Sequence, residues 1–320
     1  LLHTDPDGVQ STYDYHPGHY LRNWTEPGRS KPVRNEYDSS GRLVATVDPF
    51  GERIEIEHDV AQNLEIVRDK LGRPTITEYD ARGRVVRTLA ADGTEQRMSY
   101  DENDNLLSRT DEAGGIWSFE YDSRGFQTAS TTPLGARTER TFDDRGNTLT
   151  VRDPEGGLVA RTWSSENKLL TETDALLRTT VRTYDSAGNA ASITFADGRT
   201  VTYEHDEKGR ISKMVDSSGR TTLYETDDNG RITKETVIQP QANGPALRAA
   251  TIYTYSPAGR LLATQRADGT SLVRTYDETG RISSVEVDAV SRTNFAYDDL
   301  GRHTQTIDQD GTVQVRDYDS

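Results

Sequence analysis

An aromatic residue followed by aspartate returns through this chain at a spacing of 21 residues. The tyrosines that carry this phrase are Tyr37, Tyr79, Tyr100, Tyr121, Tyr184, Tyr276, Tyr297 and Tyr318. The same 21-residue grid contains His58, Phe142, Trp163, His205 and Thr226. An eight-residue insertion then moves the grid to Tyr255. A fixed period of this length indicates a repeat array, in which each unit buries its surface only against its neighbours.

Each repeat opens with the pattern Y-D-x-x-G-R followed by an aliphatic residue, as in residues 37–43 and 276–282. Aspartate accepts hydrogen bonds from backbone N–H groups two residues further on, and glycine adopts positive φ without steric cost. The pattern therefore predicts a tight turn after each aromatic residue. We assign structural roles to Tyr37, Asp38, Gly41, Tyr79, Asp80, Gly83, Tyr121, Asp122, Gly125, Tyr184, Asp185, Gly188, Tyr276, Asp277, Gly280, Tyr297, Asp298 and Gly301.

Three of the repeats on this grid lack glycine at the fourth position after the aromatic residue. Asp104 and Asn167 replace it in two of them, and both residue types tolerate the left-handed backbone conformation better than most. Gln62 replaces it in the third and does not fit this account.

A second D-x-x-G turn lies half a repeat later, for example at residues 48–51, 153–156 and 308–311. Two turns leave two strands in each repeat, and β-branched and aromatic residues recur between the turns with period two. No sustained helical period occurs. The predicted fold class is all-β, a repeat array of about fourteen 21-residue β-hairpins that forms a spiral single-layer sheet. Because strand twist forbids a flat ribbon of that width, we expect the sheet to coil into the wall of a hollow shell.

The chain divides into four segments by regularity. Residues 1–36 hold degenerate leading repeats, in which Tyr15 keeps the aromatic position and prolines interrupt strand pairing. Residues 37–232 are regular repeats, and residues 251–320 are regular repeats that are truncated inside a repeat. Residues 233–250 carry the insertion and predict a longer hairpin loop that leaves the sheet. This loop is either a contact toward a partner or a tolerated surface insertion.

Composition limits both the core and the partners. Hydrophobic residues make up only 32% of the chain and charged residues 28%, which suits a thin sheet better than a two-layer sandwich. The net charge of −15 disfavours nucleic acid, because phosphate binding needs clustered Lys and Arg. No apolar stretch reaches the length of a membrane helix, no signal peptide is visible at Leu1, and there is no cysteine. We expect the chain to be a fragment of a longer protein.

The sequence offers no convincing metal or catalytic site. His16 and His19 have no thiol partners and no helical spacing, so a polar loop pair is the better interpretation. His58 and His205 occupy the aromatic position and are expected to stack there. The repeated aspartates lack the dense oxygen spacing of a calcium loop. A glycosidase-like carboxylate pair stays open in so acidic a chain, but one carboxylate repeated in most units indicates turn capping. We assign no catalytic, cofactor-binding or metal-binding residue.

The repeated Y-D-x-x-G-R phrase resembles the Rhs or YD-repeat family over essentially the whole chain, and weakly over residues 1–36. The resemblance implies a large hollow β-shell wound from hairpins. In bacterial polymorphic toxins and in the C component of insecticidal toxin complexes, such shells enclose a C-terminal toxic domain, and related repeats form the barrel of animal teneurins. Members that cleave themselves carry an Asp-Pro-x-Gly-Leu type signature. Residues 153–158 are similar to it only superficially, so no catalytic residue is carried over.

The resemblance implies a structural wall segment of an Rhs-type toxin shell, which is not an enzyme and binds no cofactor. Its expected partners are a C-terminal toxin domain of the same parent chain, flanking repeats and delivery domains. The protein would be made in the bacterial cytoplasm and then secreted or delivered at the cell surface. The alternative is an extracellular adhesion module that binds a carbohydrate or a cell-surface receptor through Tyr, Trp and Arg side chains.

Overall fold

A computed structural model describes residues 1–27, 31–298 and 301–318 of the chain. The described residues form thirty strands and no helix, which confirms the all-β array of hairpins expected from the sequence. Asp319, the aspartate of the last repeat motif, lies outside the described residues. The chain divides into two compact units. The first unit contains residues 1–34, 186–191 and 201–320, and the second contains residues 35–185 and 192–200.

The strands are short, and most have five or six residues. The first strands are β1 (Leu2–Thr4), β2 (Gln10–Tyr15), β3 (Leu21–Thr25) and β4 (Val33–Tyr37). They are followed by β5 (Leu43–Val47), β6 (Arg53–Asp59), β7 (Leu64–Arg68), β8 (Pro74–Tyr79), β9 (Val85–Leu89), β10 (Glu95–Tyr100), β11 (Leu106–Thr110), β12 (Ile116–Tyr121), β13 (Gln127–Thr131), β14 (Arg137–Phe142), β15 (Thr148–Arg152), β16 (Leu158–Trp163), β17 (Leu169–Thr173), β18 (Thr179–Tyr184) and β19 (Ala190–Thr194). The remaining strands are β20 (Thr200–His205), β21 (Ile211–Asp216), β22 (Thr221–Thr226), β23 (Ile232–Gln239), β24 (Leu247–Tyr255), β25 (Leu261–Gln265), β26 (Ser271–Tyr276), β27 (Ile282–Val287), β28 (Ser291–Tyr297), β29 (His303–Ile307) and β30 (Val313–Val315).

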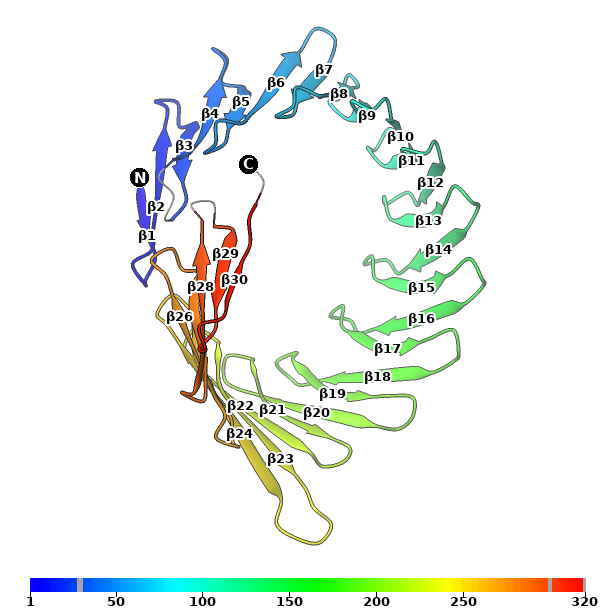
Figure 1. Ribbon diagram of the computed structural model, residues 1–320. Coiled ribbons are helices and arrows are strands. Elements are labelled where there is room, and N and C mark those ends of the chain that lie inside the picture. The colour runs from blue at the N-terminus through cyan, green and yellow to red at the C-terminus, as the bar shows by residue number, and fades with distance from the viewer. Residues whose placement is uncertain (28–30, 299–300, 319–320) are drawn as a thin grey trace. The chain divides into compact units, whose positions relative to one another are not determined.

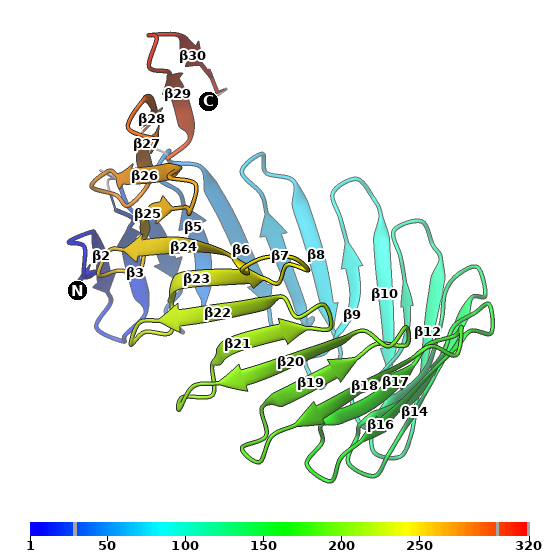
Figure 2. The same ribbon diagram turned by 90° about the horizontal axis from the view of Figure 1, so that it is seen from below.

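Within each unit, antiparallel pairing joins strands that follow one another in the chain, and most aromatic-ended strands carry a bulge. In the pair β8–β9, Glu78 lies opposite Arg87, but Tyr79 lies opposite Val85, so Val86 is the extra residue. The same shift occurs in β10–β11, β12–β13, β14–β15, β16–β17, β22–β23 and β26–β27. A bulge increases the local right-handed twist. Repeated bulges therefore bend the sheet within a unit, and the hairpins of the second unit from β5–β6 to β17–β18 follow one another along a curve (Figures 1 and 2).

The array has very little fully buried core. Among the described residues, the buried hydrophobic side chains are Ala45, Val47 and Ala129, and no large side chain is fully buried. Several large apolar side chains are instead exposed at the tips of the second turns: Phe50, Leu71, Leu134 and Leu176. Each repeat thus gains its stability from contacts along the sheet, as expected for a single layer with two wet faces.

The residue before the aromatic residue points to the opposite face, and in several repeats it meets a matched polar partner on the next strand. Hydroxyl pairs with oxygen separations of 2.6–2.7 Å join Ser99 to Ser108, Thr141 to Thr150, Thr162 to Thr171 and Thr183 to Ser192. In the first unit, Lys213 and Lys234 lie 2.7 Å from Glu204 and Glu225 at the same repeat positions. Cross-strand pairs of this kind stabilise a sheet by a few tenths of a kcal/mol to about 1 kcal/mol each. This face is therefore held by polar pairs, and the aromatic residues hold the other.

The eight-residue insertion lengthens a hairpin. Strands β23 and β24 stay paired from Lys234 opposite Ile252 to Gln239 opposite Leu247. Only residues 240–246 lie outside the two strands. Much of the segment 233–250 is thus strand, because part of the insertion lengthens β23 and β24 and the rest enlarges the turn between them.

Candidate functional site: the interlocked turns

The structure places each predicted aromatic residue at the end of a strand. These residues are Tyr37 of β4, Tyr79 of β8, Tyr121 of β12, Tyr184 of β18, Tyr276 of β26 and Tyr297 of β28. The predicted glycines follow at positive φ: Gly41 (79°), Gly83 (78°), Gly125 (86°), Gly188 (86°), Gly280 (82°) and Gly301 (77°). Because this φ lies in the left-handed region, a glycine there avoids the strain that a side chain would add.

The aspartate closes this turn with its backbone and its carboxylate. In the β8–β9 turn, the Gly83 N–H donates to the Asp80 carbonyl oxygen at 2.9 Å. Asp80 Oδ1 accepts from the backbone N–H groups of Arg82 at 2.8 Å and Arg84 at 3.0 Å. The same two bonds to the carboxylate form at Asp38, Asp122 and Asp277. One carboxylate oxygen thus satisfies the N–H groups that the tight turn leaves without strand partners.

The turns without glycine place the residue with positive φ in two different ways. Asp104 and Asn167 take φ values of 68° and 60°, as the sequence predicts. In the β6–β7 turn, the residue with positive φ is Asn63, at 55°, which is one position after Gln62. The hairpin then pairs Asp59 with Leu64 and has no bulge. Moving the left-handed residue by one position therefore removes the register shift that the other hairpins have.

Leu177 adopts φ of 63° in the second turn between β17 and β18, and sequence reasoning missed it. This left-handed conformation raises the conformational energy of a leucine by roughly 1–2 kcal/mol. Its side chain is 84% exposed, so removing it loses little packing.

We expect Leu177→Gly to raise the free energy of unfolding of the surrounding repeats by about 1 kcal/mol, measured by urea denaturation. The matched change Gly83→Ala, at φ of 78° with open space around the new Cβ, should lower it by a similar amount. Equal stability of all three proteins would contradict the assignment of strain to this φ.

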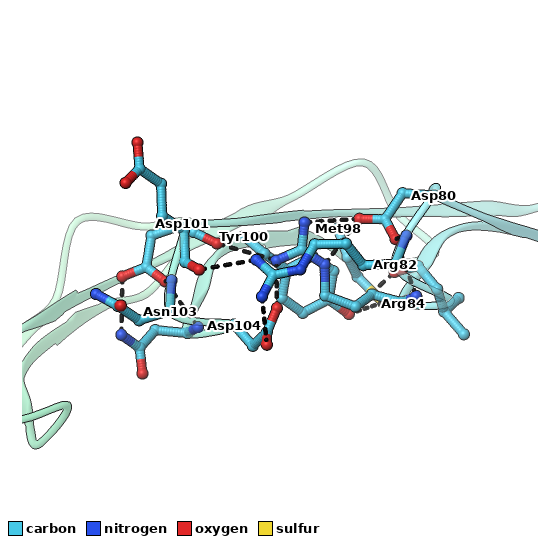
Figure 3. A network of polar contacts seen from close by, with 11 residues as sticks. Asp80, Arg82, Arg84, Met98, Tyr100, Asp101, Asn103 and Asp104 are labelled. Atoms are coloured by element: carbon cyan, nitrogen blue, oxygen red, sulfur yellow. Dashed lines mark hydrogen bonds and ion pairs between the residues drawn. The ribbon is translucent and has the colours of Figure 1, made fainter.

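The arginine after the glycine joins one repeat to the next (Figure 3). Arg84 donates from Nε to Asp80 Oδ2 at 2.7 Å and from Nη1 to the Asp101 carbonyl oxygen at 2.9 Å. Its guanidinium also lies 4.9 Å from the centre of the Tyr100 ring. Corresponding ring contacts at 4.7–5.0 Å join Arg231 to Tyr255, Arg281 to Tyr297 and Arg302 to Tyr318. The recurring Gly-Arg pair was the sequence signal for this role, which single-repeat reasoning did not assign.

The polar tip of the aromatic residue makes a second joint between repeats. The Tyr100 hydroxyl donates to the Val85 carbonyl oxygen of the preceding hairpin at 2.9 Å. The hydroxyls of Tyr121, Tyr184, Tyr276 and Tyr297 make the same bond to a carbonyl fifteen residues earlier, at 2.8–3.0 Å. Trp163 uses its indole N–H to reach Thr148, and His58 uses Nε2 to reach Leu43. In these repeats, the aromatic position thus carries a ring with a donor at its far end.

Phe142 has no donor, and its neighbours compensate. Phe126 replaces the usual arginine of the preceding turn, and its ring stacks on Phe142 with centroids 5.2 Å apart. Arg124 lies 4.9 Å from the Phe126 ring and donates to the Asp143 carbonyl oxygen at 2.7 Å, the bond that the missing arginine would make. The link between these two repeats is therefore made by an aromatic stack and by an arginine two positions before the usual one.

Phe126→Leu is expected to lower the free energy of unfolding by about 1 kcal/mol, because it removes one aromatic pair and one cation–π contact. The measurement is the urea denaturation midpoint. Phe195→Leu is the matched control, since Phe195 is 39% exposed and its one ring contact within the described residues is with an arginine at 5.7 Å. If both variants lose the same stability, the Phe126–Phe142 stack has no special role.

In the described residues, each resolved shift places the pKa of the group further from neutral pH. Hydrogen bonding from Arg84 lowers the pKa of Asp80, and the Asn105 side-chain amide lowers the pKa of Asp101. Burial raises the pKa of Tyr121 and Tyr297, and hydrogen bonding to Glu120 raises the pKa of Arg137. A general acid or base works best with a pKa near the working pH. Near neutral pH these groups instead keep one charge state, which suits structural hydrogen bonds.

A cluster of polar side chains lies at the irregular β6–β7 hairpin. His58 Nδ1 is 3.3 Å from Glu65 Oε2, and Glu65 also forms a hydrogen bond with Tyr79. They line a surface hollow of about 380 Å³ together with Arg42. The direct pairing of His58 with Glu65, which follows from the missing bulge, brings these groups together. In the regular β8–β9 and β10–β11 hairpins, the bulge shifts the corresponding residue out of line.

The histidines and aspartates singled out earlier do not gather into a metal site. Within residues 1–27, 31–298 and 301–318, no group of three His, Asp or Glu side chains is arranged to hold a metal ion. The Asp153–Gly156 stretch is a hairpin turn between β15 and β16, with the Gly156 N–H donating to the Asp153 carbonyl oxygen at 3.1 Å. No helix among the described residues is long and apolar enough to cross a membrane.

Comparisons with known proteins agree with this architecture. The family model described as Teneurin YD-shell matches residues 64–244. A crystal structure of TcdB2–TccC3–Cdc42 superimposes with a TM-score of 0.60 at 14% identity, covering 93% of this chain and 20% of that chain. A TcdB2–TccC3 structure without the hypervariable C-terminal region gives 0.60 at 15% identity, covering 94% and 20%. This chain thus spans about one fifth of those chains, and the likeness shows the fold alone. No curated protein matches the sequence.

The family match includes many of the hairpins whose turns, arginines and aromatic tips are described above, among them the β8–β9 and β10–β11 hairpins. It extends from the start of β7 into the lengthened turn between β23 and β24, which is more than half of the chain. The resemblance of the repeated phrase to YD repeats is therefore confirmed, and the chain belongs to the Teneurin YD-shell family.

Proposed function

We propose that this chain is a wall segment of a YD-repeat shell, and that the complete shell encloses a toxic domain carried C-terminally by the same parent chain. The observation that carries the proposal is the joint between repeats. An arginine and an aromatic tip fasten each turn to the next, so a single layer of hairpins holds together without a thick core. The net charge of −15 opposes nonspecific association of such a wall with acidic surfaces.

The solved relatives support this proposal through their fold and their descriptions. One of them is a TcdB2–TccC3 structure described as lacking a hypervariable C-terminal region. By analogy, the partners of this chain are a variable C-terminal cargo, flanking repeats and delivery domains. The parent protein would be made in the bacterial cytoplasm and secreted or delivered at the cell surface. The segment itself would perform no catalysis.

The test is limited proteolysis of the full-length parent protein. The rate at which the downstream C-terminal region is cut is compared between the native protein and the protein with its repeats denatured. A protease-sensitive tag outside the repeats serves as the control for protease activity in both states. Encapsulation predicts that the downstream region is cut slowly only while the repeats are folded.

Equal and rapid cutting in both states would overturn encapsulation. The adhesion module would then be the better proposal, and the exposed turn tips favour it as the second candidate. Phe50 is 56% exposed and Leu134 is 96% exposed, which makes them available for contact with a receptor. Binding of the native chain to glycan or cell surfaces, lost on substitution of these two residues, would establish that alternative.

A further inference from the structure

The repeat that begins at Tyr255 breaks the rule that links the turn aspartate to its arginine. In six other described turns, the arginine donates from Nε to the aspartate of its own turn: Arg42 to Asp38, Arg84 to Asp80, Arg210 to Asp206, Arg231 to Asp227, Arg281 to Asp277 and Arg302 to Asp298. Ser164 replaces aspartate in one repeat, and there Lys168 replaces arginine. Ser256 also replaces aspartate, but Arg260 is retained. This turn therefore holds an arginine with no carboxylate of its own.

The missing carboxylate comes from the N-terminal hairpin of the same unit. Asp7 Oδ2 accepts from the Ser256 hydroxyl at 2.6 Å, and Asp7 Oδ1 accepts from the Ala258 N–H at 3.0 Å. Arg260 donates from Nη1 to Asp7 and from Nη2 to Asp5 Oδ2. Asp7 and Ser256 are 249 residues apart in the sequence. The turn between β1 and β2 thus meets the turn between β24 and β25 (Figures 1 and 2).

Asp7 is directed to this contact and not to its own turn. Asp5 Oδ1 already accepts the N–H groups of Asp7 and Val9, which closes the N-terminal turn. In the related turn at residues 308–311, Asp310 Oδ1 accepts from the Thr312 N–H of its own turn. Asp7 has no such bond among those found for it, and each of its side-chain bonds reaches residues 256–260.

The contact between Asp7 and Arg260 is largely shielded from solvent. The side chains of Asp7 and Arg260 are 15% and 20% exposed, so bulk solvent screens the pair less than a fully exposed one. The hydrogen bond from Ser256 is the main reason that the pKa of Asp7 is lowered, and Arg260 adds to it. Charge-assisted hydrogen bonds of this kind are stronger than neutral ones.

We propose that the turn Ser256–Arg260 is a receptor for an acidic Asp-x-Asp-Gly turn, and that residues 5–8 of the same chain occupy it. The contact acts as a clasp between the N-terminal hairpin and the β24–β25 hairpin. Asp7 takes the place of the absent turn aspartate by capping the Ala258 N–H, while Arg260 is neutralised by Asp5 and Asp7. This inference does not depend on the enclosed cargo proposed above.

The test is amide hydrogen exchange of the full chain in two variants. Asp7→Asn removes the charge that Arg260 needs, so exchange should accelerate by about tenfold or more both at Ala258 and in β1–β2. Ser256→Asp supplies a carboxylate within the turn, as Asp277 does for Thr279 and Arg281. It should keep Ala258 protected, yet repel Asp7 and accelerate exchange in β1–β2. Asp310→Asn is the control and should leave both regions unchanged.

Two results would overturn the clasp. One is that Ser256→Asp leaves amide hydrogen exchange in β1–β2 as slow as in the unchanged protein. The other is Asp7→Asn with faster exchange in β1–β2 but not at Ala258, which would reduce Asp7 to a local role in its own hairpin. Exchange in β1–β2 should also be independent of protein concentration. A loss of protection on hundredfold dilution would instead assign the contact to a second copy of the chain.

Discussion

Tyr100→Ala is expected to lower the free energy of unfolding of its neighbouring repeats by about 3 kcal/mol, the lower end of the range for removing a packed aromatic ring. The substitution deletes a ring that lies beneath Arg84, contacts Met98 through its hydroxyl at 3.7 Å and donates to Val85. Tyr100→Phe keeps the ring and should cost only about 1 kcal/mol, the usual net value of one hydrogen bond.

Hydrogen exchange resolved along the chain measures both the size and the reach of this effect. Stability in a repeat array depends on the unit and its nearest neighbours. Protection should fall in β8 to β13 and remain unchanged at β17–β18, which serves as the internal control. If Tyr100→Phe costs as much as Tyr100→Ala, the ring packing has no value. If protection falls equally along the second unit, the nearest-neighbour description is wrong.

Acidification should unfold the array steeply below about pH 4, the range in which aspartate in an unfolded chain takes up protons. The pKa values of the turn aspartates are lowered, with hydrogen bonding from an arginine side chain as the main cause at Asp69, Asp80, Asp174 and Asp206. A carboxyl group with a lowered pKa stabilises the fold above its unfolded pKa. That stabilisation is lost as the pH falls through its folded pKa. Because the same aspartate recurs in most turns, the losses accumulate along the chain.

The urea midpoint measured from pH 7 to pH 2 tests this expectation. It should change little between pH 7 and pH 5 and then fall sharply below pH 4. The turn at Ser164 provides an internal control, because its N–H groups at Glu166 and Lys168 are capped by a hydroxyl group, which does not titrate in this range. Before the array unfolds as a whole, amides at Arg82 and Arg84 should lose protection at a higher pH than those two. A midpoint that stays flat to pH 3 would mean that the carboxylates contribute little.

Local chemistry made the hairpins predictable from the sequence. An aspartate and a glycine three residues later specify one turn geometry, and alternation over the next residues specifies a strand, so the fold class follows from a window shorter than one repeat. Asp104 and Asn167 were predictable by the same rule, because their side chains tolerate positive φ. The Gln62 turn was not, since the rule assumes a fixed turn length and the chain places the left-handed residue at Asn63.

The joints between repeats were not predictable because they connect residues that a single repeat does not contain. Arg84 meets a carbonyl group seventeen residues later, and the Tyr100 hydroxyl meets one fifteen residues earlier. The periodic pattern places these groups in register but does not say which atoms bond. Asp7 and Arg260 lie still further apart, and the only local signal was an arginine left beside Ser256 without an aspartate.

The acceptor of the aromatic hydroxyl is a backbone carbonyl group, so the residue that supplies it can vary without loss of the bond. Val85, Leu106, Leu169 and Ile282 serve equally. Even the lengthened hairpin keeps the bond, with the Tyr255 hydroxyl 3.0 Å from the Ile232 carbonyl oxygen. For the repeats that carry tyrosine at this position, we therefore expect that one 21-residue unit can be exchanged for another, because the tyrosine hydroxyl needs only a backbone carbonyl group of the preceding hairpin as its acceptor.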